Sequence, residues 1–204
     1  MAVRVKICGI TRPADARMAA AAGADLIGLN FWPNSRRAVS VLRAREIVAE
    51  LPAGVGRVGI FVNASRQEVA EALAAVPLDL IQFHGDEPAA DLRDWPCPVV
   101  RAVRLSSPND ASRALADFPE GFLLCEGQAA GGYGGAGVGF DWKLALAVPR
   151  DRLILAGGLG AGNVAAAVRL LRPWAVDVAS GVEQAPGIKD PVLVREFIEN
   201  AKAA

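Results

Sequence analysis

Short apolar runs recur along the chain, and most of them are rich in β-branched or large aliphatic side chains. Runs of this kind, closed by glycine or polar residues, are typical of strands buried on both faces. Eight can be counted, at "VRVKICG", "DLIGLNF", "RVGIFVN", "LDLIQFHG", "VVRAVRL", "GFLLCEG", "RLILAGG" and "AVDVASG".

Helix-like patterns lie between these runs, at 12–24, 41–51, 65–77, 108–118 and 159–173. The first has Pro13 near its start and Gly23 just past its end, which are favoured positions for these residues. The third begins with Ser65 and has Glu68 three residues later, the signature of a capping box. The pattern at 108–118 is the weakest of the five.

Eight strands alternating with helices predict an α/β fold with a parallel sheet, and the count of eight favours closure into a TIM (βα)8 barrel. We expect one domain over residues 1–204, because about 200 residues is the lower size limit of such a barrel. The alternative is an open, doubly wound sheet. That fold usually has a GxGxxG motif after its first strand, and "ICGITRP" does not contain one.

Composition and charge narrow the range of partners. Lys plus Arg equals Asp plus Glu at 22 each, so no net field favours nucleic acid or an acidic membrane surface. No secretory leader or membrane-spanning run is visible, and we expect a cytoplasmic protein. The three cysteines lack the spacing of a disulfide framework or a zinc site, and a single histidine argues against a metal site built on imidazoles.

Four strand ends share one pattern, a reactive or hydrogen-bonding side chain followed at once by glycine. In a TIM barrel the chemistry collects at this end of the strands. Alternation along the first strand directs Cys8 into the barrel mouth. A buried structural thiol is the alternative for Cys8 alone, but the repeated pattern favours a functional site. The four pairs are Cys8-Gly9, His84-Gly85, Glu126-Gly127 and Ser180-Gly181.

Glycine-rich turns follow the seventh and eighth predicted strands, in "LAGGLGAGN" and "ASGVE". Glycine lets backbone N–H groups approach an anion, and many TIM barrels hold a substrate phosphate here. Tight turns without a ligand are the alternative. A third stretch has seven glycines from Gly127 to Gly139, and its length predicts a mobile loop over the site.

Seven motifs, in order over nearly the whole chain, resemble those of the phosphoribosylanthranilate isomerases of tryptophan biosynthesis. The resemblance implies a TIM barrel that catalyses an Amadori rearrangement. N-(5′-phosphoribosyl)anthranilate becomes 1-(2-carboxyphenylamino)-1-deoxyribulose 5-phosphate, a reaction that uses no cofactor or metal. The motifs are "VKICGIT", "GADLIGLNFWPNSRR", "VGIFVN", "QFHGDEP", "GGYGGAGVGFDW", "LAGGL" and "VDVASGVEQAPGIKD".

The resemblance implies roles for individual residues. Cys8 matches the family's general base, and a nearby cation such as Lys6 would favour its thiolate. Arg37 matches the arginine that binds the anthranilate carboxylate, with Arg36 as its rival. His84 matches a position near the substrate and is given a supporting role.

The resemblance also implies roles for further residues. Asp177 matches a residue that faces the substrate, although a strand-end or capping role is the alternative for it. Ala38 departs from the aromatic residue usual after the arginine, so the wall of the ring-binding pocket is expected to differ. The residues that match the phosphate cradle are Gly157, Gly158, Ser180 and Gly181.

The family's general acid is an aspartate at the end of the sixth strand, and this chain has none there. Alignment on "LL" puts Cys125 at that position, whereas alignment on the following glycine puts Glu126 there. We favour Glu126, because a carboxylic acid is a better proton donor than a thiol. To act as an acid Glu126 must hold a proton, through burial or a neighbouring negative charge.

Other functions compete with the isomerase. An indole-glycerol-phosphate synthase usually has a catalytic lysine pair and extra amino-terminal sequence, and a phosphosugar epimerase needs metal-binding histidines. A non-catalytic binder of phosphoribosyl ligands would keep the cradle and lose the acid, but the presence of Cys8 argues against it. The expected ligand is a small phosphorylated molecule, and a monomer is the default.

Overall fold

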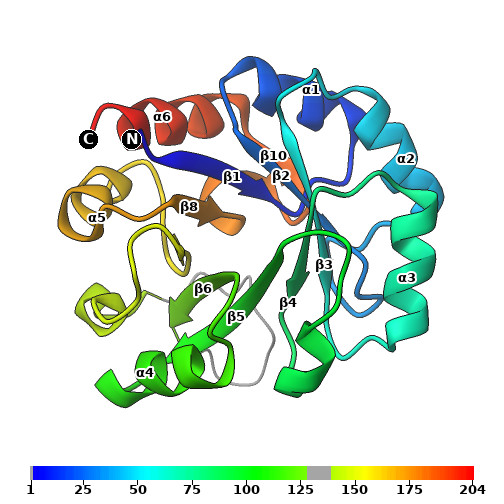
Figure 1. Cartoon of the computed structure of the whole chain (residues 1–204). Coiled ribbons are helices and arrows are strands. Elements are labelled where there is room, and N and C mark those ends of the chain that lie inside the picture. The colour runs from blue at the N-terminus through cyan, green and yellow to red at the C-terminus, as the bar shows by residue number, and fades with distance from the viewer. Residues whose placement is uncertain (1, 128–138) are drawn as a thin grey trace.

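The computed structural model describes residues 2–127 and 139–204, in which eight parallel strands form a closed barrel surrounded by helices (Figure 1). Each strand pairs with the next in the sequence, and the last pairs with the first. The predicted barrel is therefore confirmed, and the open sheet is wrong. The strands are β1 (Arg4–Cys8), β2 (Leu26–Asn30), β3 (Gly56–Phe61), β4 (Leu80–Phe83), β5 (Val99–Leu105), β6 (Phe122–Gly127), β7 (Leu153–Leu155) and β8 (Ala175–Val178).

All five predicted helices are present, and a sixth follows the barrel. Pro13 occupies the first turn of its helix, and Gly23 beyond the end has a φ of 98°. Ser65 and Glu68 form the expected capping box. The helices are α1 (Pro13–Ala21), α2 (Val41–Ala49), α3 (Arg66–Ala75), α4 (Pro108–Asp117), α5 (Val164–Leu171) and α6 (Pro191–Lys202).

The alternation of strand and helix is imperfect in two places. The connection after β4 holds only a short 3-10 helix, η1 (Ala89–Leu92), and the described part of the connection after β6 holds another, η2 (Trp142–Ala145). After β8 come a third, η3 (Ser180–Val182), and a hairpin of β9 (Glu183–Ala185) and β10 (Ile188–Lys189). On β5, Arg101 and Val103 lie on the outward face and are only half-buried.

The barrel interior changes from apolar to polar along the strands. At the amino ends a compact cluster fills the space, with Leu80, Val100 and Leu124 among its members. Two residues further along β6 and four along β5 and β4, the same inward faces carry Glu126, Arg104 and His84. A polar layer therefore closes the carboxyl end of an apolar barrel.

The outward faces of the strands pack against the helices in a larger apolar cluster. Val5 and Ile7 of β1 lie in it, and Lys6 between them is buried inside the barrel, on the face that alternation shares with Cys8. Cys125 is also in this outer cluster and is fully buried. It therefore faces away from the barrel mouth.

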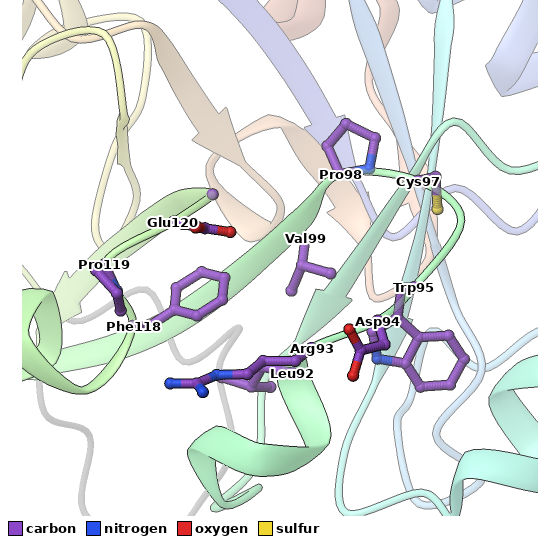
Figure 2. A pocket seen from close by; sticks show the side chains of 11 residues that line it. Leu92, Arg93, Asp94, Trp95, Cys97, Pro98, Val99, Phe118, Pro119 and Glu120 are labelled. Atoms are coloured by element: carbon purple, nitrogen blue, oxygen red, sulfur yellow. The ribbon is translucent and has the colours of Figure 1, made fainter.

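The opposite end of the barrel carries a separate hollow of about 500 Å³ at the starts of β5 and β6. Figure 2 shows the ring of Phe118 directed toward Val99, with Cys97 at one side, and Leu92 also lines the hollow. Trp95 forms one wall, and its indole Nε1 donates to Asp91 O at 2.8 Å. This hollow lies at the amino ends of the strands, away from the polar layer.

None of the helices in the described ranges combines the length and the apolar composition that a membrane crossing requires.

Candidate active site

Cys8 ends β1 at the barrel mouth, and glycines on both sides leave room for it. The β1–β2 register pairs Cys8 with Gly28, where a Cβ would come within 3.1 Å of the Cys8 sulfur. Gly9 has a φ of 73°, and the stem of Arg37 lies directly over it. The sequence around Cys8 thus allows a thiol and a guanidinium stem to meet at one turn.

Below Cys8 a buried ion pair joins the first and last strands. Lys6 and Asp177 are register partners of β1 and β8, and Lys6 Nζ donates to Asp177 Oδ1 at 2.9 Å. Only 1% of Lys6 is exposed. Asp177 therefore serves a pairing role at the barrel seam, close to the thiol.

The surroundings of Cys8 favour the protonated form of its thiol. Burial raises the pKa of the Cys8 thiol, and the negative charge of Asp177 raises it further, whereas Lys6 and Lys189 lower it. We expected Lys6 to favour the thiolate, and Lys6 does act in that direction. The effect of Lys6 is smaller than those of burial and of Asp177, and the pKa of the thiol is therefore raised.

Arg37 is held by a second buried ion network. Its Nε and Nη2 donate to the two carboxylate oxygens of Glu183 at 2.8 and 2.6 Å. Lys189 Nζ donates to Glu183 Oε1 at 2.7 Å and to Ala179 O at 3.1 Å. The guanidinium is thereby oriented by the hairpin after β8, while the rival Arg36 is exposed.

Sequence reasoning missed Glu183 and Lys189, although both lie in a quoted motif. Both side chains are almost fully buried in this network. The available signal was a glutamate and a lysine six residues apart, after the eighth strand of a predicted barrel. Without the fold, nothing in that spacing points to Arg37, which is 146 residues away from Glu183.

On the other side of the mouth, His84 and Glu126 form a buried pair. His84 Nε2 lies 3.0 Å from Glu126 Oε1, and His84 Nδ1 lies 2.8 Å from Gln82 Nε2. In the tautomer in which Nδ1 accepts from the Gln82 amide, the Nε2–H donates to the Glu126 carboxylate. About 8% of His84 and 7% of Glu126 are exposed.

The turn after His84 is fixed by hydrogen bonds. Glu87 accepts from the backbone N–H of Asn63 at 2.7 Å and of Gly85 at 2.9 Å. A Cβ at Gly85 would collide with Asn63, so glycine is required there. The pattern of a functional side chain before glycine thus has a steric reason at this strand end.

Glu126 also has a charged neighbour that the sequence did not reveal. Arg104, on the adjacent strand β5, has its Nε 4.0 Å from Glu126 Oε1. We expected burial or a negative neighbour to keep a proton on Glu126. The burial is present, but the charged side chain beside it on β5 is a cation.

The two glycine turns after β7 and β8 lie against each other. Gly157 and Gly158 have positive φ values of 79° and 66°. Asn163 closes their turn, because its side chain accepts from Gly160 N and donates to Gly158 O, each at 2.9 Å. A Cβ at Gly181 would collide with Leu159 O, so the turns touch.

Two remaining expectations concern the rim. Ala38 is exposed and lines a hollow of about 520 Å³ together with Phe31, Trp32 and Phe61. Residues 128–138 of the predicted glycine-rich loop lie outside the described residues. Within the described ranges no group of three or more His, Cys, Asp or Glu side chains is arranged to hold a metal ion.

Comparison with known proteins gives one consistent result. The family model of N-(5′-phosphoribosyl)anthranilate (PRA) isomerase matches residues 5–200. An N-(5′-phosphoribosyl)anthranilate isomerase of Pseudomonas paraeruginosa is 52% identical over 203 residues, which cover 99% of this chain and 96% of the relative.

Solved structures agree. The phosphoribosyl anthranilate isomerase of Thermotoga maritima superposes with a TM-score of 0.89 and 42% identity, covering 99% of this chain and 100% of that chain. A phosphoribosyl anthranilate isomerase in complex with reduced 1-(o-carboxyphenylamino)-1-deoxyribulose 5-phosphate has a TM-score of 0.86 and 41% identity, with the same coverage.

The environment of Cys8 predicts its reactivity. In a Cys97→Ser protein, alkylation of Cys8 by iodoacetamide should be slow at neutral pH and accelerate with rising pH, because its pKa is raised. Asp177→Asn should move this acceleration to lower pH, since it removes a negative charge and releases Lys6. Cys125 should stay unmodified, because burial raises its pKa to about 12.

The modified residue is identified by mass spectrometry at each pH. Asp151→Asn, at an exposed position before β7, is the matched control and should leave the rate profile unchanged. An Asp177→Asn profile that coincides with that of the parent protein would contradict the assigned influence of Asp177.

Proposed function

The chain belongs to the N-(5′-phosphoribosyl)anthranilate isomerase family and is an isomerase, and from this premise we propose that it converts N-(5′-phosphoribosyl)anthranilate to 1-(2-carboxyphenylamino)-1-deoxyribulose 5-phosphate. The observation that carries the proposal is the barrel mouth itself. A thiol on β1 and a carboxyl group on β6 face the same polar layer from different sides. A reaction that needs one acid and one base could use both.

The first step opens the ribose ring. The anthranilate nitrogen forms a double bond to C1 while the bond from C1 to the ring oxygen breaks, and the ring oxygen takes a proton. We assign this proton to Glu126, because its side chain points into the mouth and that of Cys125 points away. The product of this step is a Schiff base that carries a positive charge.

The second step moves a proton from C2. The Cys8 thiolate removes it, the electron pair of the C2–H bond forms the C1–C2 double bond, and the nitrogen regains its lone pair. The resulting enolamine becomes the ketone when C1 takes up a proton and the C2 hydroxyl group loses one. The raised pKa of Cys8 favours the protonated thiol before the reaction, so the thiol first releases its proton to solvent, and the positive charge of the Schiff base would favour the resulting thiolate.

The remaining assignments concern binding. Arg37 is proposed to bind the anthranilate carboxylate, since its guanidinium is oriented beside the Cys8 turn and one nitrogen, Nη1, is not used in the Glu183 contacts. The phosphate is proposed to bind at the touching turns of Gly157, Gly158, Ser180 and Gly181, where the backbone can approach closely. His84 supports Glu126 through its hydrogen bond, and Asp177 through Lys6 keeps the base side in place.

The experiment that tests the function uses freshly prepared phosphoribosylanthranilate and follows the fall of its fluorescence. The protein should accelerate this fall far beyond spontaneous decay. Cys8→Ala should lower turnover by roughly a hundredfold to ten-thousandfold, the typical value of a general base. Cys97→Ala, at the opposite end of the barrel, is the matched control and should keep normal turnover. A fully active Cys8→Ala protein would refute the role of the thiol.

The acid is tested by two neighbouring substitutions. Under saturating substrate, Glu126→Gln should lose most turnover, because the amide has no acidic proton to give to the ring oxygen. Cys125→Ser should remain active if it folds, which circular dichroism can check, since this side chain lies in the outer core. Loss of turnover in Cys125→Ser with a normal fold, together with an active Glu126→Gln, would transfer the role to Cys125.

The carboxylate site is tested by comparing neighbouring arginines. Arg37→Met should raise the KM for phosphoribosylanthranilate by about tenfold or more, because a charge-assisted bond is lost. Arg36→Met should leave it unchanged, since Arg36 is exposed. Inorganic phosphate should inhibit both variants competitively and with equal strength, because its proposed site is separate. Equal KM values for the two variants would remove the assignment.

A further inference from the structure

Arg104 lies on the inward face of β5, and the residues before it on that face are apolar. Val100 and Ala102 precede it on the inward face of β5 and pack in the inner apolar cluster. Alternation makes Arg104 the next inward residue, at the carboxyl end of the strand. About 27% of its side chain is exposed, so the guanidinium sits in the polar layer of the mouth.

The guanidinium reaches both members of the acidic side of the site. Its Nε lies 4.0 Å from Glu126 Oε1, and the β5–β6 register pairs the two residues directly. Its Nη2 donates to the backbone oxygen of His84 at 3.3 Å, and its Nη1 lies 3.6 Å from Asp86 Oδ1. Arg104 therefore contacts strand β6 on one side and the residue that follows β4 on the other.

The charges around Glu126 can be assigned element by element. From β5 comes Arg104, and from the segment after β4 comes His84, with Asp86 on the far side of the guanidinium. On the β7 side the register partners of β6 are apolar, ending with Leu155 beside Cys125. Among the described residues in these contacts, Arg104 supplies the permanent positive charge.

This arrangement matters for a group that donates a proton. A carboxylic acid is neutral before the transfer and negative after it, so a cation at this distance stabilises the product of the transfer more than the reactant. The position of Arg104 on a strand, rather than on a loop, keeps that cation in place. His84 alone would not supply a charge in its neutral form.

We propose that Arg104 is a positioning residue of the isomerase reaction, which orients the Glu126 carboxyl group and stabilises the carboxylate left after proton donation. The proposal rests on the proposed function, and specifically on Glu126 as the acid. It adds a residue for which neither the motifs nor the comparisons assign a role. It also gives a reason for a charged residue in a predicted apolar strand.

The single histidine of the chain makes a direct test possible. The ring proton on Cε1 of His84 gives one NMR signal, whose chemical shift at a fixed pH reports on the hydrogen bond between His84 and Glu126. Arg104→Met should shift this signal, because the Glu126 carboxyl group loses the guanidinium beside it. Arg101→Met changes the same residue type on the same strand, but on the outward face, and should leave the signal in place.

Arg104→Lys keeps the charge and should shift the signal less than Arg104→Met does. If Arg104→Met fails to fold, Arg104→Gln with normal circular dichroism replaces it and should shift the signal in the same way. A signal that is unchanged in the charge-removing variant, or that shifts equally in Arg101→Met, would overturn the proposal.

Kinetics with phosphoribosylanthranilate supply a second measurement. Arg104→Met should lower kcat by about tenfold and leave KM within about twofold, with partial recovery in Arg104→Lys. A large rise in KM at unchanged kcat would overturn the proposal, because it would show that Arg104 binds the substrate. The experiments distinguish failure of Glu126 as the acid from failure of the role proposed for Arg104. An active Glu126→Gln protein rejects Glu126 as the acid, whereas an inactive one combined with an unchanged His84 signal in Arg104→Met rejects only the role of Arg104.

Discussion

The closure of eight parallel strands into a ring is the constraint on which the other features of this molecule depend. Closure makes every second residue of each strand face the same interior, and parallel direction brings all carboxyl ends to one rim. The seam between β1 and β8 is secured by a buried ion pair, Lys6 with Asp177, at a register pair of the two strands. Removing one partner of such a pair leaves an uncompensated charge in the interior, which typically costs about 3–5 kcal/mol. The first and last strands are thus held together next to the thiol.

The charged side chains at the rim of the barrel lie in pairs or small groups of opposite charge. The base side combines Lys6 with Asp177, and Arg37 with Glu183 and Lys189, while the acid side combines Arg104 with Glu126 and Asp86. Each of these carboxyl groups has a cation within salt-bridge distance, and the buried Glu87 beside them accepts two backbone N–H bonds instead. Pairing also orients the side chains, because a carboxylate that accepts two hydrogen bonds from Arg37 fixes the plane of its guanidinium. The same contacts that stabilise the rim therefore prepare its geometry.

Much of this molecule could be predicted from local sequence. Strand and helix positions depend on periodicity and on capping residues such as Ser65, which are visible in a few neighbouring positions. The partner of Arg37 is 146 residues away, and nothing local identifies it. Arg104 was hidden for another reason, since an arginine inside "VVRAVRL" reads as an interruption of a strand until alternation assigns Arg101 and Arg104 to opposite faces. A shift of one residue along the sixth strand decides whether Cys125 or Glu126 faces the barrel interior. The sequence left both alignments open, and the structure shows Cys125 in the outer cluster.

The two halves of the rim are buried unequally. α6 packs against β1, the strand of Lys6 and Cys8, whereas β5 has four successive half-buried residues although α4 packs against it. Local opening starts where apolar cover is thin, and it needs less free energy there than in the rest of a fold. On warming, the half of the rim that holds Arg104 should lose its order before the half that holds Cys8. The upper temperature at which this chain keeps its activity would then be set by the β5 side of the barrel, below the temperature at which the barrel as a whole unfolds.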